Sequence, residues 1–252
     1  MDKRVAGVDK MRFYGDWPKV KPDEILVIPK DDRLLEHPPF RNSTGWPEWF
    51  KRAPKVDKVE VSIQNCKGIQ DFLSLGVTVP LWGDVKVHPT EGGGVAAAMA
   101  DPFFTTTQFP REAVQGCPIM EDTPMEHAGC PDLRSPFLYK TAPGYSLLAL
   151  PVLYEPDSRY QVLPSVVNTD YFHRVNLIFR VLTDEEFIIP AGTPVYHLIP
   201  FKRSDTGKVK TVTMGEARMF PMLKNRGIGW GGFDTFRRKR LYRQHEREAD
   251  GN

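Results

Sequence analysis

The stretch Val175-Asn176-Leu177-Ile178-Phe179-Arg180-Val181 decides the fold class, because its β-branched and apolar residues favour a strand. It lies inside the longer strand-like segment Tyr171–Leu182. After it, Phe187-Ile188-Ile189 enters a turn at Pro190-Ala191-Gly192, where glycine permits a tight reversal. Strands at such close spacing predict a sandwich or a barrel. The neighbouring strand-like segments are Tyr145–Tyr154, Tyr160–Val167 and Thr193–Phe201.

The same pattern continues toward the N-terminus. Val77–Trp82 is a continuous apolar run, and Val85 to Ala100 predicts a hairpin turning at three consecutive glycines. That glycine run lacks the lysine and hydroxyl of a phosphate-binding loop, and the chain has no nucleotide fingerprint. Further strands are predicted at Glu24–Ile28, at the alternating Val59, Val61 and Ile63, and at Val209, Thr211 and Thr213.

The predicted helices are few and short. Pro47 sets the first turn of one, beside two tryptophans, and Gly68–Leu75 forms a second that Gly76 closes. We therefore predict a mainly β chain, an antiparallel sandwich or barrel of jelly-roll-like type, with residues 1–223 as the principal domain. The residues expected to be largely buried in its core are Leu81, Leu148, Leu150, Leu177, Phe179, Ile189 and Leu198.

Two regions depart from this pattern. Residues 101–143 have no sustained period and are rich in proline, glycine and threonine, so we expect an irregular arm. Residues 224–252 begin with a glycine-rich passage around Trp230, after which Asp234 is placed to cap a basic C-terminal helix, Thr235–Glu248. Loops this long in compact domains are usually functional or make interactions.

Positive charge gathers at the C-terminal end. The chain as a whole carries a net charge of +2, whereas Lys224–Glu248 alone carries +5. Such a segment favours an acidic protein surface or nucleic acid, although Tyr242 is the only aromatic residue close to most of the charges, which weakens the case for base stacking. The residues expected to bind a partner are Phe233, Phe236, Arg237, Arg238, Lys239, Arg240, Leu241, Tyr242 and Arg243.

A metal site is one alternative. Cys117, His127 and Cys130 fall close together with acidic residues between them, and zinc takes thiolate and imidazole ligands. Their spacing matches no standard zinc finger, and a fourth ligand would have to come from elsewhere. His173 and His197 lie on predicted strands, as in iron oxygenases of the jelly-roll type, but neither has an acid two residues later.

Composition points to an ordinary globular protein. The 252 residues include three cysteines, too few and too scattered for a disulfide framework, which favours a reducing compartment. The chain has no run of about 20 apolar residues that would span a membrane. The polar first ten residues lack the apolar core of a secretory signal, so a cytoplasmic site of synthesis and assembly is expected.

Several short motifs carry a resemblance. They are Trp46-Pro47-Glu48-Trp49-Phe50, Cys66-Lys67-Gly68, Val79-Pro80-Leu81-Trp82-Gly83-Asp84, Asn176-Leu177-Ile178-Phe179, Ile189-Pro190-Ala191-Gly192-Thr193-Pro194 and His197-Leu198-Ile199-Pro200. Together they resemble an uncharacterised family of tailed-bacteriophage proteins, notably from phages of aquatic bacteria, with relatives in bacterial genomes. The similar region runs from Trp46 to Phe201. The resemblance implies a phage origin, and it carries over no catalytic residues to this sequence.

From these observations we expect a non-enzymatic virion component, such as a capsid decoration or head–tail accessory protein, located in the virion and assembled in the host cytoplasm. Its partners would be other virion proteins and copies of itself, with no cofactor and no membrane contact. One alternative is a metal-dependent β-barrel or jelly-roll enzyme that uses the Cys117–Cys130 loop or the strand histidines. Another is a nucleic-acid-binding accessory factor that uses the basic C-terminal residues.

Overall fold

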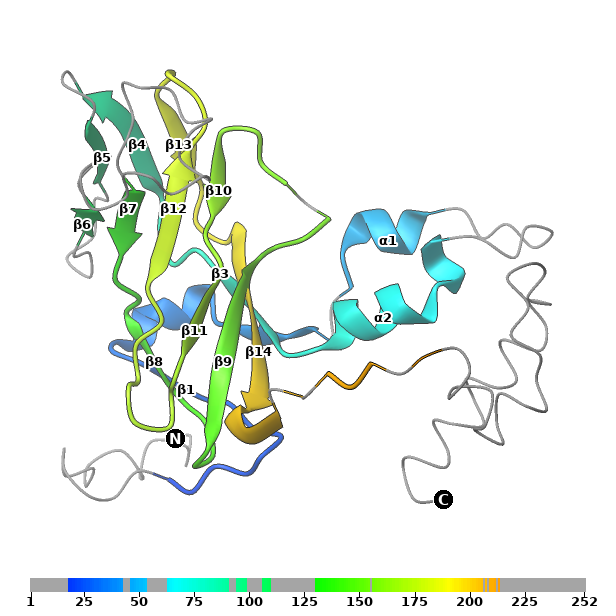
Figure 1. Ribbon diagram of the computed structural model, residues 1–252. Coiled ribbons are helices and arrows are strands. Elements are labelled where there is room, and N and C mark those ends of the chain that lie inside the picture. The colour runs from blue at the N-terminus through cyan, green and yellow to red at the C-terminus, as the bar shows by residue number, and fades with distance from the viewer. Residues whose placement is uncertain are drawn as a thin grey trace, which may run out of the picture.

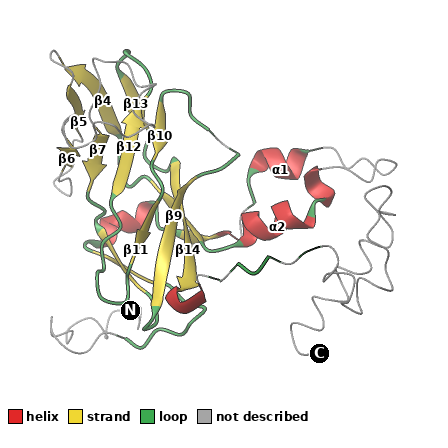
Figure 2. Cartoon of the chain, viewed as in Figure 1, coloured by secondary structure: helices red, strands yellow, loops and turns green. Residues whose placement is uncertain are grey.

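A computed structural model describes residues 18–42, 46–53, 63–90, 94–98, 106–109, 130–154, 156–205, 207, 209–211 and 213. Within these ranges the chain is mainly β, as the sequence predicts. Antiparallel sheets form the body, and two short α-helices stand out from one side of it (Figures 1 and 2). No helix in the described part of the chain has the length and apolar character needed to cross a membrane.

The largest sheet has five strands in the order β11-β9-β14-β3-β2. Its centre is the long antiparallel pair of β9 and β14, which runs through the middle of the molecule (Figure 1). On the other edge of β14, β3 continues the sheet and β2 pairs with β3 at its end. The strands are β2 Phe40–Arg41, β3 Val77–Pro80, β9 Tyr145–Pro151, β11 Ser165–Val167 and β14 Pro194–Lys202.

A second sheet has four strands in the order β10-β12-β7-β6. Its β12, Leu177–Val181, lies within the stretch that the sequence marked most clearly as a strand, and its residues alternate between buried and half-buried. The other three strands are β6 Thr106–Phe109, β7 Cys130–Leu133 and β10 Tyr160–Val162.

Two smaller sheets complete the body. The order β13-β4-β5 contains the predicted hairpin, whose strands β4 Val85–Thr90 and β5 Gly94–Ala98 pair antiparallel. The other is a pair of β1 Leu26–Pro29 and β8 Phe137–Lys140. In the three-stranded sheet, β13 is Phe187–Ile189 and pairs with β4. Short 3-10 helices lie at Asp32–Glu36, Ile63–Asn65 and Arg203–Asp205.

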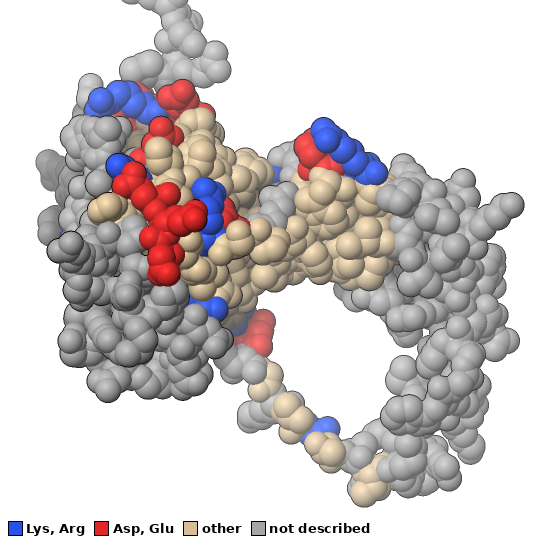
Figure 3. Space-filling model, turned by 90° about the horizontal axis from the view of Figure 1, so that it is seen from above, with Lys and Arg blue, Asp and Glu red and all other residues tan. Residues whose placement is uncertain are grey.

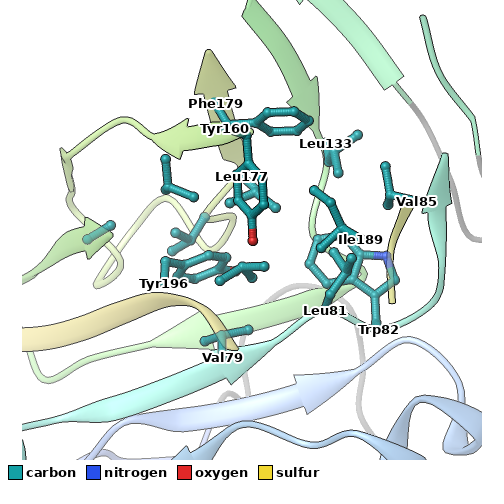
Figure 4. Close-up of a cluster of buried hydrophobic side chains, with 14 of the residues drawn as sticks. Val79, Leu81, Trp82, Val85, Leu133, Tyr160, Leu177, Phe179, Ile189 and Tyr196 are labelled. Carbon is teal, nitrogen blue, oxygen red and sulfur yellow. The ribbon is translucent and has the colours of Figure 1, made fainter. Parts of the chain in front are cut away.

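One continuous hydrophobic core joins these sheets. Side chains from the five-stranded sheet, such as Val79 and Tyr196, face Leu177 and Phe179 of the second sheet, while Ile189 of β13 fills the space between (Figure 4). None of the described sheets closes into a barrel, so the packing is sandwich-like. Of the residues expected in the core, Leu81, Leu177, Phe179, Ile189 and Leu198 are buried as predicted.

Strand β9 buries a different face from the predicted one. Leu147 and Ala149 are buried, whereas Leu148 and Leu150 are only half-buried. The reason is that Leu147-Leu148-Ala149-Leu150 is apolar on both faces of the strand, so the alternation that normally separates the two faces is missing.

The prediction of an irregular arm at 101–143 is wrong where the structure describes that region. Three strands, β6, β7 and β8, lie within it, and β7 pairs with both β6 and β12 inside the second sheet. All four residues of β7, Cys-Pro-Asp-Leu, are buried. A four-residue strand with no polar face and an internal proline carries no periodic signal, which is why the pattern does not reveal it.

Other strand predictions also need correction. Tyr160–Val167 is two strands, β10 and β11, which belong to different sheets and are separated at Leu163-Pro164. Ile63 begins a 3-10 helix, whereas Val59 and Val61 lie outside the described residues. Val209 and Thr211 are not in a strand, and Val209 is 96% exposed. Alternation over so few residues was too short to identify a strand.

Candidate binding pocket between the helices and the largest sheet

The two helices form a small unit beside the β body. Helix α1, Glu48–Arg52, begins after Pro47 as predicted, and α2, Lys67–Ser74, lies next to it (Figure 1). The indole nitrogen of Trp46 donates a 3.0 Å hydrogen bond to Ser74 Oγ, which joins the start of α1 to the end of α2. Phe50, which Trp46 and Trp49 contact edge-on, is 1% exposed and anchors the unit.

Tyr154 joins the helices to the sheet. It follows β9, and its ring lies 5.7 Å from the ring of Trp49 and 6.2 Å from that of Phe72 in α2. Its φ of +71° is a left-handed conformation that costs a non-glycine residue about 1–2 kcal/mol. The aromatic contacts on both helices offset that cost, so they fix the loop after β9 against the helical unit.

A pocket of about 300 Å³ lies where the helical unit meets the edge of the largest sheet. That volume is at the small end of the roughly 300–1,000 Å³ typical of small-molecule sites. It suits one or two side chains of a protein better than a nucleotide. Its walls are mostly apolar, with contributions from Phe40, Trp46, Pro47, Phe72, Leu153 and Pro194.

Besides the charged Glu48 and Lys51, three uncharged polar side chains line the pocket, and they bond to one another and to the backbone. Thr78 Oγ1 donates to Asn42 Oδ1 over 2.6 Å, and Asn42 Nδ2 donates to the carbonyl of Leu75 over 2.7 Å. His197 Nε2 lies within hydrogen-bonding distance of the same carbonyl and 2.6 Å from Asn42 Nδ2. Since these side chains already bond within the protein, few of their hydrogen-bond donors and acceptors are left for a ligand.

His197 is held as a neutral imidazole. Burial lowers its pKa below the usual value of 6.5, and the bond to the Leu75 carbonyl opposes this only in part. The ring packs edge-on against Phe72 with 5.3 Å between the ring centres. His197 therefore brings no charge to the pocket at neutral pH, which keeps this side of it compatible with an apolar occupant.

The outer rim carries paired charges. Lys51 Nζ lies 2.7 Å from Glu48 Oε1, and Arg52 lies 3.8 Å from the other oxygen of the same carboxylate. These side chains are largely exposed, and a small mixed group of blue and red atoms marks the otherwise tan helical unit (Figure 3). These two cations and one carboxylate leave the rim with a small net positive charge, which solvent screens.

A second exposed feature lies on the loop before β12. Tyr171 is 68% exposed and Phe172 is 57% exposed. The loop is well anchored, because Asp170 accepts two bonds from Arg203, at 2.8 and 2.6 Å, and Tyr171 OH accepts a 2.6 Å bond from Asn168. Large aromatic side chains on a fixed surface loop are typical of protein contact sites.

The structure describes only one of the three residues of the suggested metal site. Cys130 is 1% exposed in β7, opposite Phe109 of β6, whereas Cys117 and His127 lie outside the described residues. Among the residues that are described, no three His, Cys, Asp or Glu side chains gather as metal ligands would. The predicted partner-binding residues from Phe233 to Arg243 also lie outside the described part.

The two histidines considered as iron ligands have different settings. His197 is in β14 as predicted, with its Nε2 near the Leu75 carbonyl. His173 is not on a strand: it precedes β12, and its Nδ1 lies 2.9 Å from the carbonyl of Thr169. Its position in the loop follows from a turn at Asp170-Tyr171, which the strand-like composition concealed.

Sequence reasoning missed most of the pocket. Trp46, Pro194 and His197 belong to the motifs that carried the phage resemblance, but Asn42, Thr78 and Leu153 carry no local signal. Two of those motifs also meet in space: Leu81 N donates to the Thr193 carbonyl over 2.8 Å, and Gly192 N donates to the Leu81 carbonyl over 2.8 Å. The pairing of β3 with β14 thus brings the motif residues together.

Two comparisons with known proteins were negative. No protein-family model matches the chain, and a search of curated proteins finds no match.

Proposed function

We propose that this chain is a non-enzymatic component of a tailed-phage particle, either a capsid decoration protein or a head–tail accessory protein. Its fold would be a jelly-roll-like sandwich with a basic helix at Thr235–Glu248. The particle, assembled in the host cytoplasm, would supply its partners. The short motifs between Trp46 and Phe201 support the phage origin, and the sandwich body provides a rigid platform.

The observation that carries this proposal is the character of the pocket. Its walls are mainly apolar, Asn42, Thr78 and His197 already form hydrogen bonds, and Glu48 and Lys51 pair with each other. A hydrolytic or transfer site needs a nucleophile or base with bonding capacity directed at a substrate. An apolar pocket with internally bonded polar groups instead suits the insertion of a protein side chain.

The fixed loop beside Asp170 supports the same role. Tyr171 and Phe172 project from a loop that Arg203 anchors, so a partner would lose little conformational entropy on ordering it. The basic residues Arg237, Arg238, Lys239 and Arg240 would then add attraction to an acidic surface. Affinity would come from the aromatic contacts, and orientation from the charges.

The test is quantitative mass spectrometry of particles purified from the phage that carries the gene. We expect the chain at a fixed copy number per particle that survives high-salt washing. Tyr171→Ser combined with Phe172→Ser should lower that copy number, whereas Ile188→Ser, at another exposed apolar position, should not. Absence of the protein from washed particles would contradict the virion role.

A further inference from the structure

The pocket raises the question of what occupies it in the free protein. At about 300 Å³ the pocket is large enough to hold several waters. Water at the walls formed by Phe72, Leu153 and Pro194 finds few hydrogen-bond partners. Releasing it to the bulk on insertion of an apolar side chain is therefore favourable.

The chain itself leads toward this side of the molecule. After β14 and the 3-10 helix Arg203–Asp205, the described residues around Val209–Thr211 extend away from the sheets (Figure 1). They extend on the same side of the β body as α1 and α2, and the view from above agrees (Figure 3). Thirty-nine residues of the sequence follow Thr213.

Those residues include aromatic and apolar side chains of the kind that would fit the pocket. Trp230, Phe233, Phe236, Leu241 and Tyr242 occur within thirteen positions, among many basic residues. Aromatic residues are the usual anchors of protein contacts, because one side chain buries a large apolar area with few rotatable bonds. Arginine and lysine beside such an anchor can remain in water while the ring is buried.

The connection is long enough for docking within one molecule. Phe233 lies twenty positions after Thr213 in the sequence, which at about 3.3 Å per position allows at most roughly 66 Å. A random coil of that length spans roughly 25 Å on average. Such a tether gives an effective concentration in the millimolar range, far above that of a second copy in dilute solution.

We propose that in the free protein an aromatic side chain from the Phe233–Tyr242 segment occupies the pocket between α1, α2 and β14 of the same molecule. The basic residues of that segment then remain in water outside the pocket while the ring is buried. The pocket and the segment cover each other's apolar surface. The inference does not depend on the virion role, because it concerns the isolated chain.

Trypsin provides the test, since Arg237, Arg238, Lys239 and Arg240 are cleavage sites next to the proposed anchors. In the full-length protein we compare the wild type with Leu153→Trp, which fills the pocket from its rim, and with Val166→Trp, at an exposed site on β11. We expect cleavage at the four sites to be at least fivefold faster in Leu153→Trp only. Equal rates in all three proteins, at matched unfolding midpoints, would overturn the proposal.

A photo-cross-linking residue at position 236 identifies the contact directly. We expect cross-links to peptides containing Leu153 or Trp46, with a yield that does not change on dilution; the same group at position 209 is the control. Mixing isotopically light with heavy protein distinguishes cross-links within one molecule from cross-links between two copies. Cross-links between light and heavy chains would assign the pocket to a second copy, and links away from the pocket would also overturn the inference.

Discussion

Gly76 lies against the backbone of Leu198 so closely that a Cβ added to it would be 2.0 Å from the Leu198 carbonyl oxygen. Gly76 is the residue at which the chain passes from α2 to β3, and its φ of +63° is in the left-handed region. Its backbone carbonyl also accepts a 3.2 Å hydrogen bond from Asn42 N. The absence of a side chain at this position therefore allows the helical unit to join the sheet.

Gly76→Ala should consequently lower the unfolding free energy by more than the cost of placing alanine in a left-handed conformation. The matched control is Gly144→Ala, because Gly144 has a φ of +82° but no atom within 4 Å of an added Cβ. We expect the control to lose about 1–2 kcal/mol of unfolding free energy and Gly76→Ala to lose clearly more. Urea unfolding measures both, and equal losses would contradict the close approach.

Leu177→Ala tests the core between the sheets. Leu177 is 1% exposed, so its truncation should cost about 2–5 kcal/mol, the usual penalty for an emptied core site. The neighbouring Ile178 on the opposite face of β12 is half-buried, and Ile178→Ala should cost distinctly less. A smaller loss at position 177 than at 178 in chemical unfolding would show that β12 presents its other face to the core.

The neutral state of His197 predicts a dependence of stability on pH. Because burial lowers its pKa in the folded protein, the unfolded chain binds a proton more readily below about pH 6.5. Stability from this group is therefore complete above that pH and is lost as the pH falls through the folded-state pKa. His197→Gln should flatten the decline of the unfolding midpoint on acidification. An unchanged pH profile in the variant would contradict this assignment.

Asp170→Asn probes the anchor of the exposed aromatic loop. The hydrogen bonds from Arg203 lower the pKa of Asp170, which also accepts a 2.9 Å bond from Gly144 N. Losing this partly buried pair should cost about 1–3 kcal/mol, more than an exposed pair is worth. Glu48→Gln, in an exposed ion pair of α1, is the control and should change stability clearly less than Asp170→Asn does. Thermal unfolding of both variants separates them.

The metal hypothesis has its own test. We expect the purified protein to lack stoichiometric zinc or iron, because Cys130 is enclosed in β7 rather than presented on a loop. Elemental analysis of the wild type, Cys130→Ser and Cys66→Ser measures this, with Cys66 as an exposed control. One equivalent of metal that disappears only in Cys130→Ser would favour the enzyme alternative over a binding role.

The sequence by itself determined the elements whose residues carry a local signal. Alternation identified β12, the glycine-rich turn identified the hairpin of β4 and β5, and Pro47 and Gly76 marked one end of each α-helix. These features depend on near neighbours in the chain, since side-chain period and backbone freedom are local properties. Where a strand is apolar on both faces, as β9 is, the same reasoning could not identify the buried side.

Only the tertiary structure decided where the candidate site lies. Asn42, Phe72, Leu153 and His197 come from distant segments of the chain, and none has a spacing that predicts the others. They meet because β3 pairs with β14 on one side and with β2 on the other, which places α2 beside the loop after β9. Pairing between distant strands depends on the packing of the whole core, and no short window of sequence contains that information.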